Sequence, residues 1–329
     1  MFGSPRRVLI VATLFVIAGC SGGTASQTPS ATSQGVNAFV HAGVPFAPPM
    51  LRTMVRPGIS ASYSTRKSLV FEGDQEEAAV NIYQTTKLSS NPSPIATIHA
   101  AAGCPYGLAV DKSGTVYVAD NCGGSDVEEY SKGSTTLKTR ITDGISNPLG
   151  LAIDKQGTLY VSNYPASITE YAKGTTTPSK TITGGGMTDP FGLALDKSGN
   201  LYIADFGASA VFELPAGGSS VTNLNLSGLG EPLGVAFDQK TGYLWETGGS
   251  GNVINVYDLS TSTSPIETIS GHGDPYAIST ENAGKPKGEV VESDLDTDSV
   301  YAYKPGSYTS YATLTTDIEL PTGLLIAKP

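Results

Sequence analysis

Three groups of residues in this chain could do chemistry: three cysteines, three histidines and a recurring set of acidic and amide residues. The recurring set consists of Gly73, Asp120, Asn163, Asp205, Gly248 and Asp294. Several oxygen ligands gathered at one place could hold a hard cation. Asp, Asn and Gly are also the residues that tight turns select, and their interchange at one position favours turn chemistry over a cation site.

The cysteines and histidines point to structure rather than catalysis. Cys104 and Cys122 flank a predicted hairpin that turns near Ser113, so their sulfurs should meet on neighbouring strand ends. Outside the cytoplasm we expect a disulfide, and two separately buried thiols are the alternative. His41 precedes the repeats, whereas His99 and His272 fall in or next to outer strands, so a three-histidine site is not expected.

The elements that position these residues repeat along the chain. The phrase Pro-x-Gly-Leu-Ala-x-Asp begins at Pro105, Pro148, Pro190, Pro232 and Pro275, with a shortened copy at Pro321. Successive copies are 43, 42, 42, 43 and 46 residues apart. A period of this length indicates a repeat architecture, and the fold follows from the period.

Each copy has the pattern of four short strands. Alternating apolar residues run to a Gly-containing turn such as Lys112-Ser113-Gly114, return as a second strand, and are followed by two more. This predicts an all-β six-bladed β-propeller with four antiparallel strands per blade. The C-terminal copy has only its inner strand, and residues 69–98 supply the missing three. We therefore expect the C-terminal strand to pair with the N-terminal strands and close the ring.

The phrase Gly-Leu-Ala-x-Asp-x-x-Gly-x-Leu-Tyr-Val-Ala-Asp resembles the NHL repeat, and Tyr243-Leu-Trp-Glu-Thr247 resembles the related YWTD repeat. The resemblance covers residues 66–329 and implies the fold, but these propellers include binding modules, receptors and enzymes. Gluconolactonase-like relatives hold a divalent cation with Glu, Asn and Asp at the tops of inner strands. The matching residues here are Tyr106, Leu149, Phe191, Leu233, Tyr276 and Thr322. None is a carboxylate or an amide, so we expect no lactonase metal, no cofactor and no catalytic residue there.

The N-terminus has the pattern of an exported lipoprotein. Arg6 and Arg7 precede an apolar run that is too short to span a bilayer and suits a signal peptide over residues 1–19. Ile17-Ala-Gly-Cys20 resembles the bacterial lipobox, which implies lipidation of Cys20; an ordinary signal peptide is the alternative. Ser21 favours the outer membrane if the cell is Gram-negative. Residues 20–65 are rich in Ser, Thr, Gly and Pro, which predicts a disordered tether.

The charge of the chain excludes one class of partner. The net charge is −10, and no basic patch interleaved with aromatic residues is present, so we do not expect nucleic acid to bind. We expect a monomer that meets the membrane only through its lipid anchor.

Two functions remain open on the sequence. The preferred one is a non-catalytic, anchored scaffold that binds an envelope or extracellular protein, peptide or glycan at the channel mouth, through the Pro-x-Gly residues. Those side chains could instead plug the channel. The alternative function is a hydrolase or lyase that acts on an extracellular small molecule.

Overall fold

The computed structural model describes residues 62–329 except 66, 100–102, 123–124 and 285–286. The predicted signal peptide, Cys20 and most of the predicted tether lie outside the described residues. Within the described part, Ser62 forms a bridge with Ser134, and the ring of Tyr63 packs edge-on against Phe71. None of the helices in this part has the length and apolar character needed to cross a membrane.

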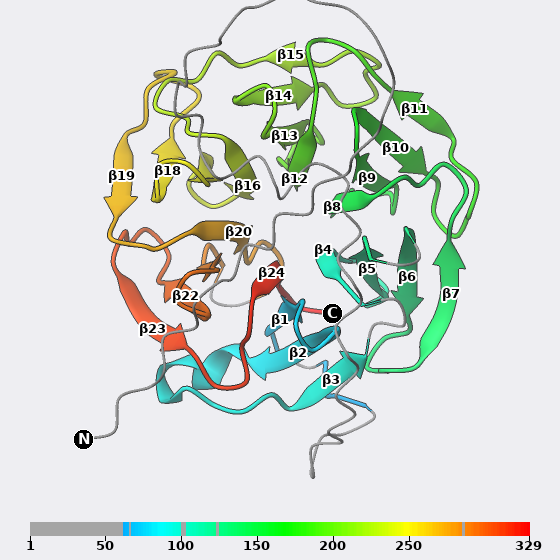
Figure 1. Cartoon of the computed structure of the whole chain (residues 1–329), viewed down its shortest axis with the longest axis vertical. Helices are drawn as coiled ribbons and strands as arrows, with labels where there is room; N and C mark the ends of the chain where they lie inside the picture. Colours follow the sequence, from blue (N-terminus) through cyan, green and yellow to red (C-terminus); the bar gives the residue numbers. More distant parts are fainter. Residues whose placement is uncertain (1–61, 66, 100–102, 123–124, 285–286) are drawn as a thin grey trace, which may run out of the picture. The chain divides into compact units, whose positions relative to one another are not determined.

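The described chain folds into six four-stranded antiparallel sheets, which are the six predicted blades around a central channel (Figure 1). Blade I combines β24 (Pro321–Ala327) with β1 (Leu69–Asp74), β2 (Ala79–Gln84) and β3 (Ala96–His99). Blade II is β4 (Pro105–Val110), β5 (Val116–Asp120), β6 (Asp126–Tyr130) and β7 (Leu137–Ile141), and blade III is β8 (Pro148–Ile153), β9 (Leu159–Asn163), β10 (Ser167–Tyr171) and β11 (Lys180–Ile182). Blade IV is β12 (Pro190–Leu195), β13 (Leu201–Asp205), β14 (Ala210–Leu214) and β15 (Thr222–Asn223). Blade V is β16 (Pro232–Asp238), β17 (Tyr243–Gly248), β18 (Val253–Tyr257) and β19 (Glu267–Ser270), and blade VI is β20 (Pro275–Thr280), β21 (Val290–Asp294), β22 (Ser299–Tyr303) and β23 (Ser310–Leu314).

The ring closes as the sequence predicts. β24 pairs antiparallel with β1, with Phe71 opposite Leu325, and becomes the inner strand of blade I (Figure 1). The chain ends are thus joined through one sheet, which leaves no inner strand of the ring unpaired. The sequence did not predict the 3₁₀ helix at Thr85–Ser90, which occupies the long connection between β2 and β3.

The glycine of each Pro-x-Gly phrase lets neighbouring inner strands approach closely. A Cβ atom built on Gly192 would lie 2.7 Å from the carbonyl oxygen of Leu233 in the next blade. Such a contact is too short for a real side chain, so glycine is required by the close approach of the backbones and not by a turn. Blade VI carries Ala277 at this position, in the most altered copy of the phrase.

Apolar residues fill the space between every pair of neighbouring blades. One cluster joins blades IV and V through Val211, Val235 and Leu244, and another joins blades V and VI through Trp245, Ile254 and Val290. Six such clusters follow the ring, so the core is a series of blade interfaces. Each blade depends on both of its neighbours for burial.

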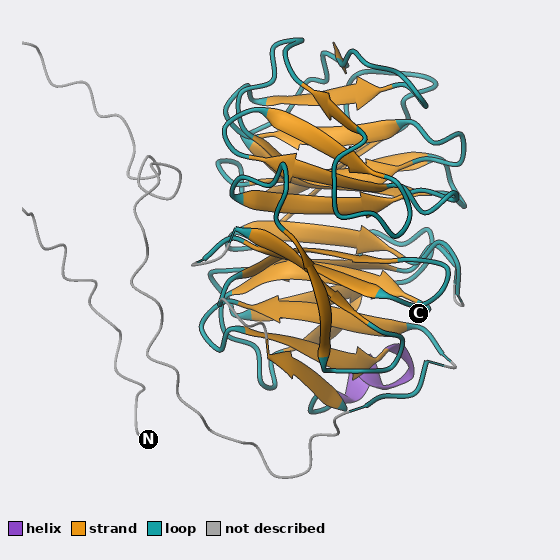
Figure 2. Cartoon of the chain, turned by 90° about the vertical axis from the view of Figure 1, so that its right-hand side faces the viewer, coloured by secondary structure: helices purple, strands orange, loops and turns teal. Residues whose placement is uncertain are grey.

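The loops gather at the two ends of the strands (Figure 2). We call one end the entry face: it carries the loops that lead into each inner strand and those that join second and third strands. We call the other end the hairpin face: it carries the turns between first and second strands, such as 111–115, 154–158 and 196–200. The first residues of the inner strands, including the Pro-x-Gly phrases, lie at the entry face.

Candidate functional site: the two ends of the channel

The six residues at the x position of the Pro-x-Gly phrases meet at the entry end of the channel. Leu149, Phe191, Leu233 and Tyr276 form one apolar cluster, with exposures between 5% and 8%, and half-buried Tyr106 packs against it. The rings of Phe191 and Tyr276 lie edge to face at 6.3 Å. Thr322 is also buried, and its hydroxyl donates to the carbonyl of Pro105 at 2.9 Å. These side chains therefore fill the end of the channel, and only Tyr106 offers much area to a ligand.

A second set of apolar residues surrounds this cluster and was not recognised in the sequence. Tyr164, Phe206 and Leu295 are half-buried and pack against it. Each directly follows the last residue of a second strand, so the loops between second and third strands carry them over the channel end. The aligned residues Gln75, Asn121 and Gly249 differ in character, which is why the repeat comparison did not single out this position.

The recurring acidic residues at the ends of second strands hold the entry loops together. Asp120 accepts hydrogen bonds from the backbone N–H groups of Gly103, Cys104 and Cys122 at 3.0 to 3.2 Å. Asp205 and Asp294 accept equivalent backbone bonds from Asp189 and Thr297. Each carboxylate thus links two loops, which is the role of turn chemistry.

One residue of this set, Gly73, was assigned from the sequence to the wrong position. In blade I the residue opposite the proline of the inner strand is Asp74, which pairs with Pro321, whereas Gly73 pairs with Gly323. Asp74 accepts the N–H groups of Glu77 and Glu319, as its counterparts do in other blades. A register irregularity between Gly73 and Asp74 accounts for the one-residue error.

Charge is distributed unequally between the two faces. The loops of the entry face contain acidic residues but neither Lys nor Arg. Their described residues are 75–78, 103–104, 121–122, 125, 142–147, 164–166, 183–189, 206–209, 224–231, 249–252, 271–274, 295–298 and 315–320. Asp296, Asp298 and Glu319 are exposed there. The field of this end therefore favours positively charged partners.

Several carboxyl groups of the entry face have raised pKa values, among them Asp74, Asp189 and Asp274. Burial, together with like-charge repulsion from the nearby Asp205, raises the pKa of Asp189 to about 7. Burial likewise raises the pKa of Asp274 to about 6, with Asp296 and Asp294 adding like-charge repulsion. The negative charge of this face should therefore increase between pH 5 and pH 8.

The channel itself is an apolar cavity of about 320 Å³ lined by all six inner strands. At the hairpin face its lining includes Val110, Ile153, Leu195 and Phe237, which are half-buried. The cavity is therefore closed by buried side chains at the entry end and less tightly covered at the hairpin end. Among the described lining residues, Glu281 is the only acidic one. It is engaged by the backbone N–H of Ala283 at 2.8 Å.

Exposed lysines surround the hairpin end of the channel. The ammonium group of Lys112 donates to the carbonyl of Lys155 at 2.5 Å, and Lys155 donates to the carbonyl of Lys197 at the same distance. The three residues occupy equivalent positions in the turns of blades II, III and IV. This face therefore carries exposed lysines, which the described loops of the entry face lack.

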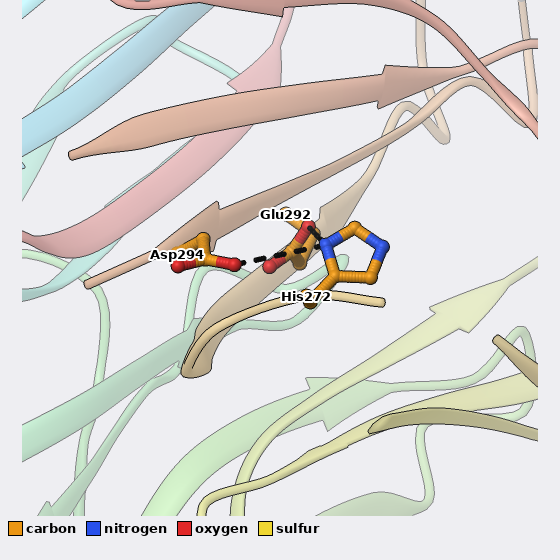
Figure 3. Close-up of side chains that lie close together, drawn as sticks. All are labelled: His272, Glu292 and Asp294. Atoms are coloured by element: carbon orange, nitrogen blue, oxygen red, sulfur yellow. Dashed lines mark ion pairs between the residues drawn. The ribbon is translucent and has the colours of Figure 1, made fainter. Parts of the chain in front are cut away.

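His272, Glu292 and Asp294 form a cluster of potential metal ligands (Figure 3), and none of the three lines the channel. Nδ1 of His272 is 3.4 Å from Glu292 and 3.8 Å from Asp294, and one ligand atom from each residue falls within 4.8 Å of the others. Burial raises the pKa of Glu292 well above its usual range and lowers that of His272. The sequence indicated His272 and Asp294 as separate features and gave no sign that Glu292 lies beside them. Residues 273–291 separate His272 from Glu292 along the chain, so only the fold brings the two together.

The predicted disulfide is present at the entry face. Cys104 and Cys122 are bonded, with their Cα atoms 5.0 Å apart, and the backbone N–H of Asn121 donates to the carbonyl of Cys104. The hairpin geometry expected from the repeat is thus confirmed. The bridge fixes the loop before β4 against the loop after β5.

Comparison with known proteins supports the fold and leaves the function open. No protein-family model matches the chain, and no curated protein matches its sequence. Among solved structures, the chain is similar to one in a nidogen/laminin complex, with a TM-score of 0.67 and 20% identity over 79% of this chain and 98% of the other.

Two lyase structures also resemble the chain. One is a catalytically inactive virginiamycin B lyase from Staphylococcus aureus with quinupristin, with a TM-score of 0.54 and 12% identity over 78% of this chain and 87% of the other. The second is a streptogramin B lyase, with a TM-score of 0.56 and 17% identity over 82% of this chain and 88% of the other. At these identities the similarities show a six-bladed propeller shared by a protein of a binding complex and by enzymes.

Proposed function

We propose that this protein is a non-catalytic, lipid-anchored propeller outside the cytoplasm that binds a cationic peptide or protein segment at its entry face. The observation that carries the proposal is the combination of a central apolar surface with loops that hold carboxylates and no Lys or Arg. A partner with exposed lysine or arginine and at least one large apolar side chain complements both features.

The apolar part of the binding surface consists of Tyr106, Tyr164, Phe206 and Leu295. All four are half-buried, and the underlying cluster of Leu149, Phe191, Leu233 and Tyr276 supports them from below. Phe206 lies 6.1 Å from the ring of Phe191. A rigid apolar surface of this kind binds with little loss of side-chain freedom, because packing already restricts the rings.

The acidic part of the surface supplies selectivity and speed. Asp296 and Asp298 lie in the loop of Leu295, while Glu231 and Asp274 lie in the loops that lead into blades V and VI. Negatively charged partners would be repelled, and cationic partners would associate faster at low ionic strength. The neighbour from the nidogen/laminin complex supports protein binding as a use of this fold.

The channel gives less support to the alternative of a hydrolase or lyase. Its lining side chains are mainly aliphatic, and Glu281, the one acidic residue among the described lining residues, has its Oε1 engaged by the backbone N–H groups of Ala283 and Gly284. General acid and base catalysis needs titratable groups within reach of a bound substrate. Turnover of lactones by the purified protein, abolished by a chelator, would contradict the non-catalytic proposal.

The anchor is the second part of the proposal and rests on Ile17-Ala-Gly-Cys20. Replacing Cys20 with Ala should abolish labelling by a clickable fatty acid and move the protein out of the membrane fraction. Equal labelling of the wild type and C20A would contradict lipidation. Either result leaves binding at the entry face to be judged separately.

The binding proposal can be tested with a synthetic peptide of alternating lysine and tryptophan and its glutamate-tryptophan counterpart. Fluorescence anisotropy should show that the lysine peptide binds and that binding weakens with salt, whereas the glutamate peptide does not bind. Asp296→Lys should weaken binding of the lysine peptide several-fold, and Phe206→Ser should weaken it at least tenfold.

The matched control is Lys197→Glu, because Lys197 is exposed on the hairpin face. This variant should bind the lysine peptide as the wild type does. Stronger effects of Lys197→Glu than of Asp296→Lys, or equal binding of both peptides, would contradict the assignment to the entry face.

A further inference from the structure

The cluster of His272, Glu292 and Asp294 lies where blade VI departs from the other blades. His272 precedes the proline of its inner strand by three residues. The residues at the same position elsewhere are Ile145, Met187, Leu229 and Ile318. All four are apolar and take part in the packing between blades. Blade VI therefore has a titratable side chain where packing alone would select an aliphatic one.

The buried glutamate of blade VI also lacks the partner that its counterparts have. Glu72 in blade I and Glu246 in blade V each accept a hydrogen bond from an asparagine on the adjacent strand, at 3.2 and 3.0 Å. In blade VI the residue opposite Glu292 is Tyr301. Both carboxylate oxygens of Glu292 are buried and accept no hydrogen bond from the described part of the chain.

A carboxylate in this condition is costly unless a positive charge compensates it. Glu292 is fully buried, and Nδ1 of His272, 3.4 Å away, also has no hydrogen-bond partner among the described residues. The two groups and Asp294 are directed at the same point (Figure 3). One imidazole nitrogen and two carboxylates form a ligand set that first-row divalent metals accept.

We propose that Nδ1 of His272, Glu292 and Asp294 bind a structural divalent cation, and that Zn²⁺ fits the site best. Ligand atoms on one tetrahedral zinc ion lie roughly 3.4 Å apart, so the 3.4 and 3.8 Å separations from Nδ1 need little adjustment. The Glu292 and Asp294 oxygens lie within 4.8 Å of each other and would move closer together on binding the ion. Calcium takes six to eight oxygen ligands and magnesium keeps several waters, which suits a buried site with a histidine ligand poorly.

The surroundings of the site support a bound cation. The hydroxyl of Tyr303 lies 3.1 Å from Nε2 of His272, so the second ring nitrogen can donate to it while Nδ1 faces the metal. Asp274 and Asp296 add negative charge close to Asp294. None of the three ligands lines the channel, although Asp294 directly precedes Leu295 of the entry-face binding surface. The ion would fix the loop between blades V and VI to β21.

The test measures zinc binding by the full-length protein, purified in detergent and stripped with a chelator. After dialysis against buffered Zn²⁺, elemental analysis should find one equivalent per chain, and zinc should raise the melting temperature. Competition with a fluorescent zinc chelator gives the affinity. Co²⁺ should report a nitrogen and oxygen ligand set through its visible absorption.

Two variants remove ligands, one removes the hydroxyl beside Nε2 of His272, and one is a matched control. His272→Met places the residue of blade IV at this position, and Glu292→Gln keeps the shape of the side chain; each should weaken zinc binding about 100-fold or more. Tyr303→Phe should weaken it by a smaller factor of about 10. Glu246→Gln, which changes the equivalent glutamate of blade V, should leave it unchanged.

The proposal is overturned if the wild type retains no zinc above background, or if His272→Met and Glu292→Gln bind zinc as tightly as the wild type. If the wild type binds no zinc and His272→Met is more stable than the wild type, the cluster is a buried ion pair only. If His272→Met fails to fold, Glu292→Gln decides the question by the same measurement.

Discussion

The two ends of the channel are built from the same six repeats and yet have opposite surfaces. At the entry end, apolar side chains close the channel under loops that are acidic and contain no Lys or Arg. At the hairpin end, the channel lining is half-buried and Lys112, Lys155 and Lys197 surround it. Strand residues are constrained by packing between blades, whereas loops are free to diverge, so the loops carry the information about function.

The largest expected effect comes from opening the ring, which should abolish both ends together. Deleting residues 320–329 removes β24, which pairs with β1 and packs beside β4 and β20. We expect global loss of cooperative unfolding, because the deletion exposes two sheet edges and two blade interfaces. Thermal unfolding followed by circular dichroism tests this. A truncated protein with an unchanged midpoint would show that closure through β24 does not hold the ring together.

The next-largest effect distinguishes the tightly packed entry end of the channel from the less tightly covered hairpin end. Phe191 at the entry end is 5% exposed, whereas Phe237 at the hairpin end is half-buried and stacks on Tyr202. Phe191→Ala should lower the free energy of unfolding by about 3–5 kcal/mol, and Phe237→Ala by roughly half as much. Urea unfolding of both variants measures the difference. Equal losses would mean that the entry end is no better packed than the hairpin end.

The disulfide is a constraint found at the entry end. Cys104 and Cys122 are 18 residues apart, and closing such a loop contributes on the order of 3 kcal/mol in the chain-entropy model. Reduction, or replacement of both residues by Ser, should lower the melting temperature while the far-ultraviolet spectrum stays the same. The bridge would be refuted by peptide mapping that finds both thiols alkylated without prior reduction.

The smallest effect concerns the charge of the entry face. The pKa of Asp189 is raised to about 7, so this group loses its proton as the pH rises from 6 to 8. The deprotonation adds negative charge, so the affinity for the lysine-tryptophan peptide should increase a few-fold over this range. Asp189→Asn should flatten the profile. An affinity that falls with rising pH would contradict the role of this carboxylate.

The sequence predicted the fold and the disulfide because both depend on local patterns. The Pro-x-Gly phrase recurs in every blade except blade VI, which carries Ala277, and the hairpin at Ser113 places Cys104 opposite Asn121. The packing at the entry end of the channel could be predicted less fully, because Phe191 and Tyr276 lie in one cluster with Phe206 and Leu295, which come from loops without a repeating pattern. Glu292 reaches His272 only through strand register, which the sequence does not display.

The measurement that tests the central claim most directly is hydrogen exchange of the protein with and without the lysine-tryptophan peptide. Binding at the entry face should protect backbone amides in residues 206–209 and 295–298, at low salt, and leave 111–115 and 196–200 unchanged. Protection confined to the turns of the hairpin face, or no protection under conditions of saturating peptide, would contradict the account.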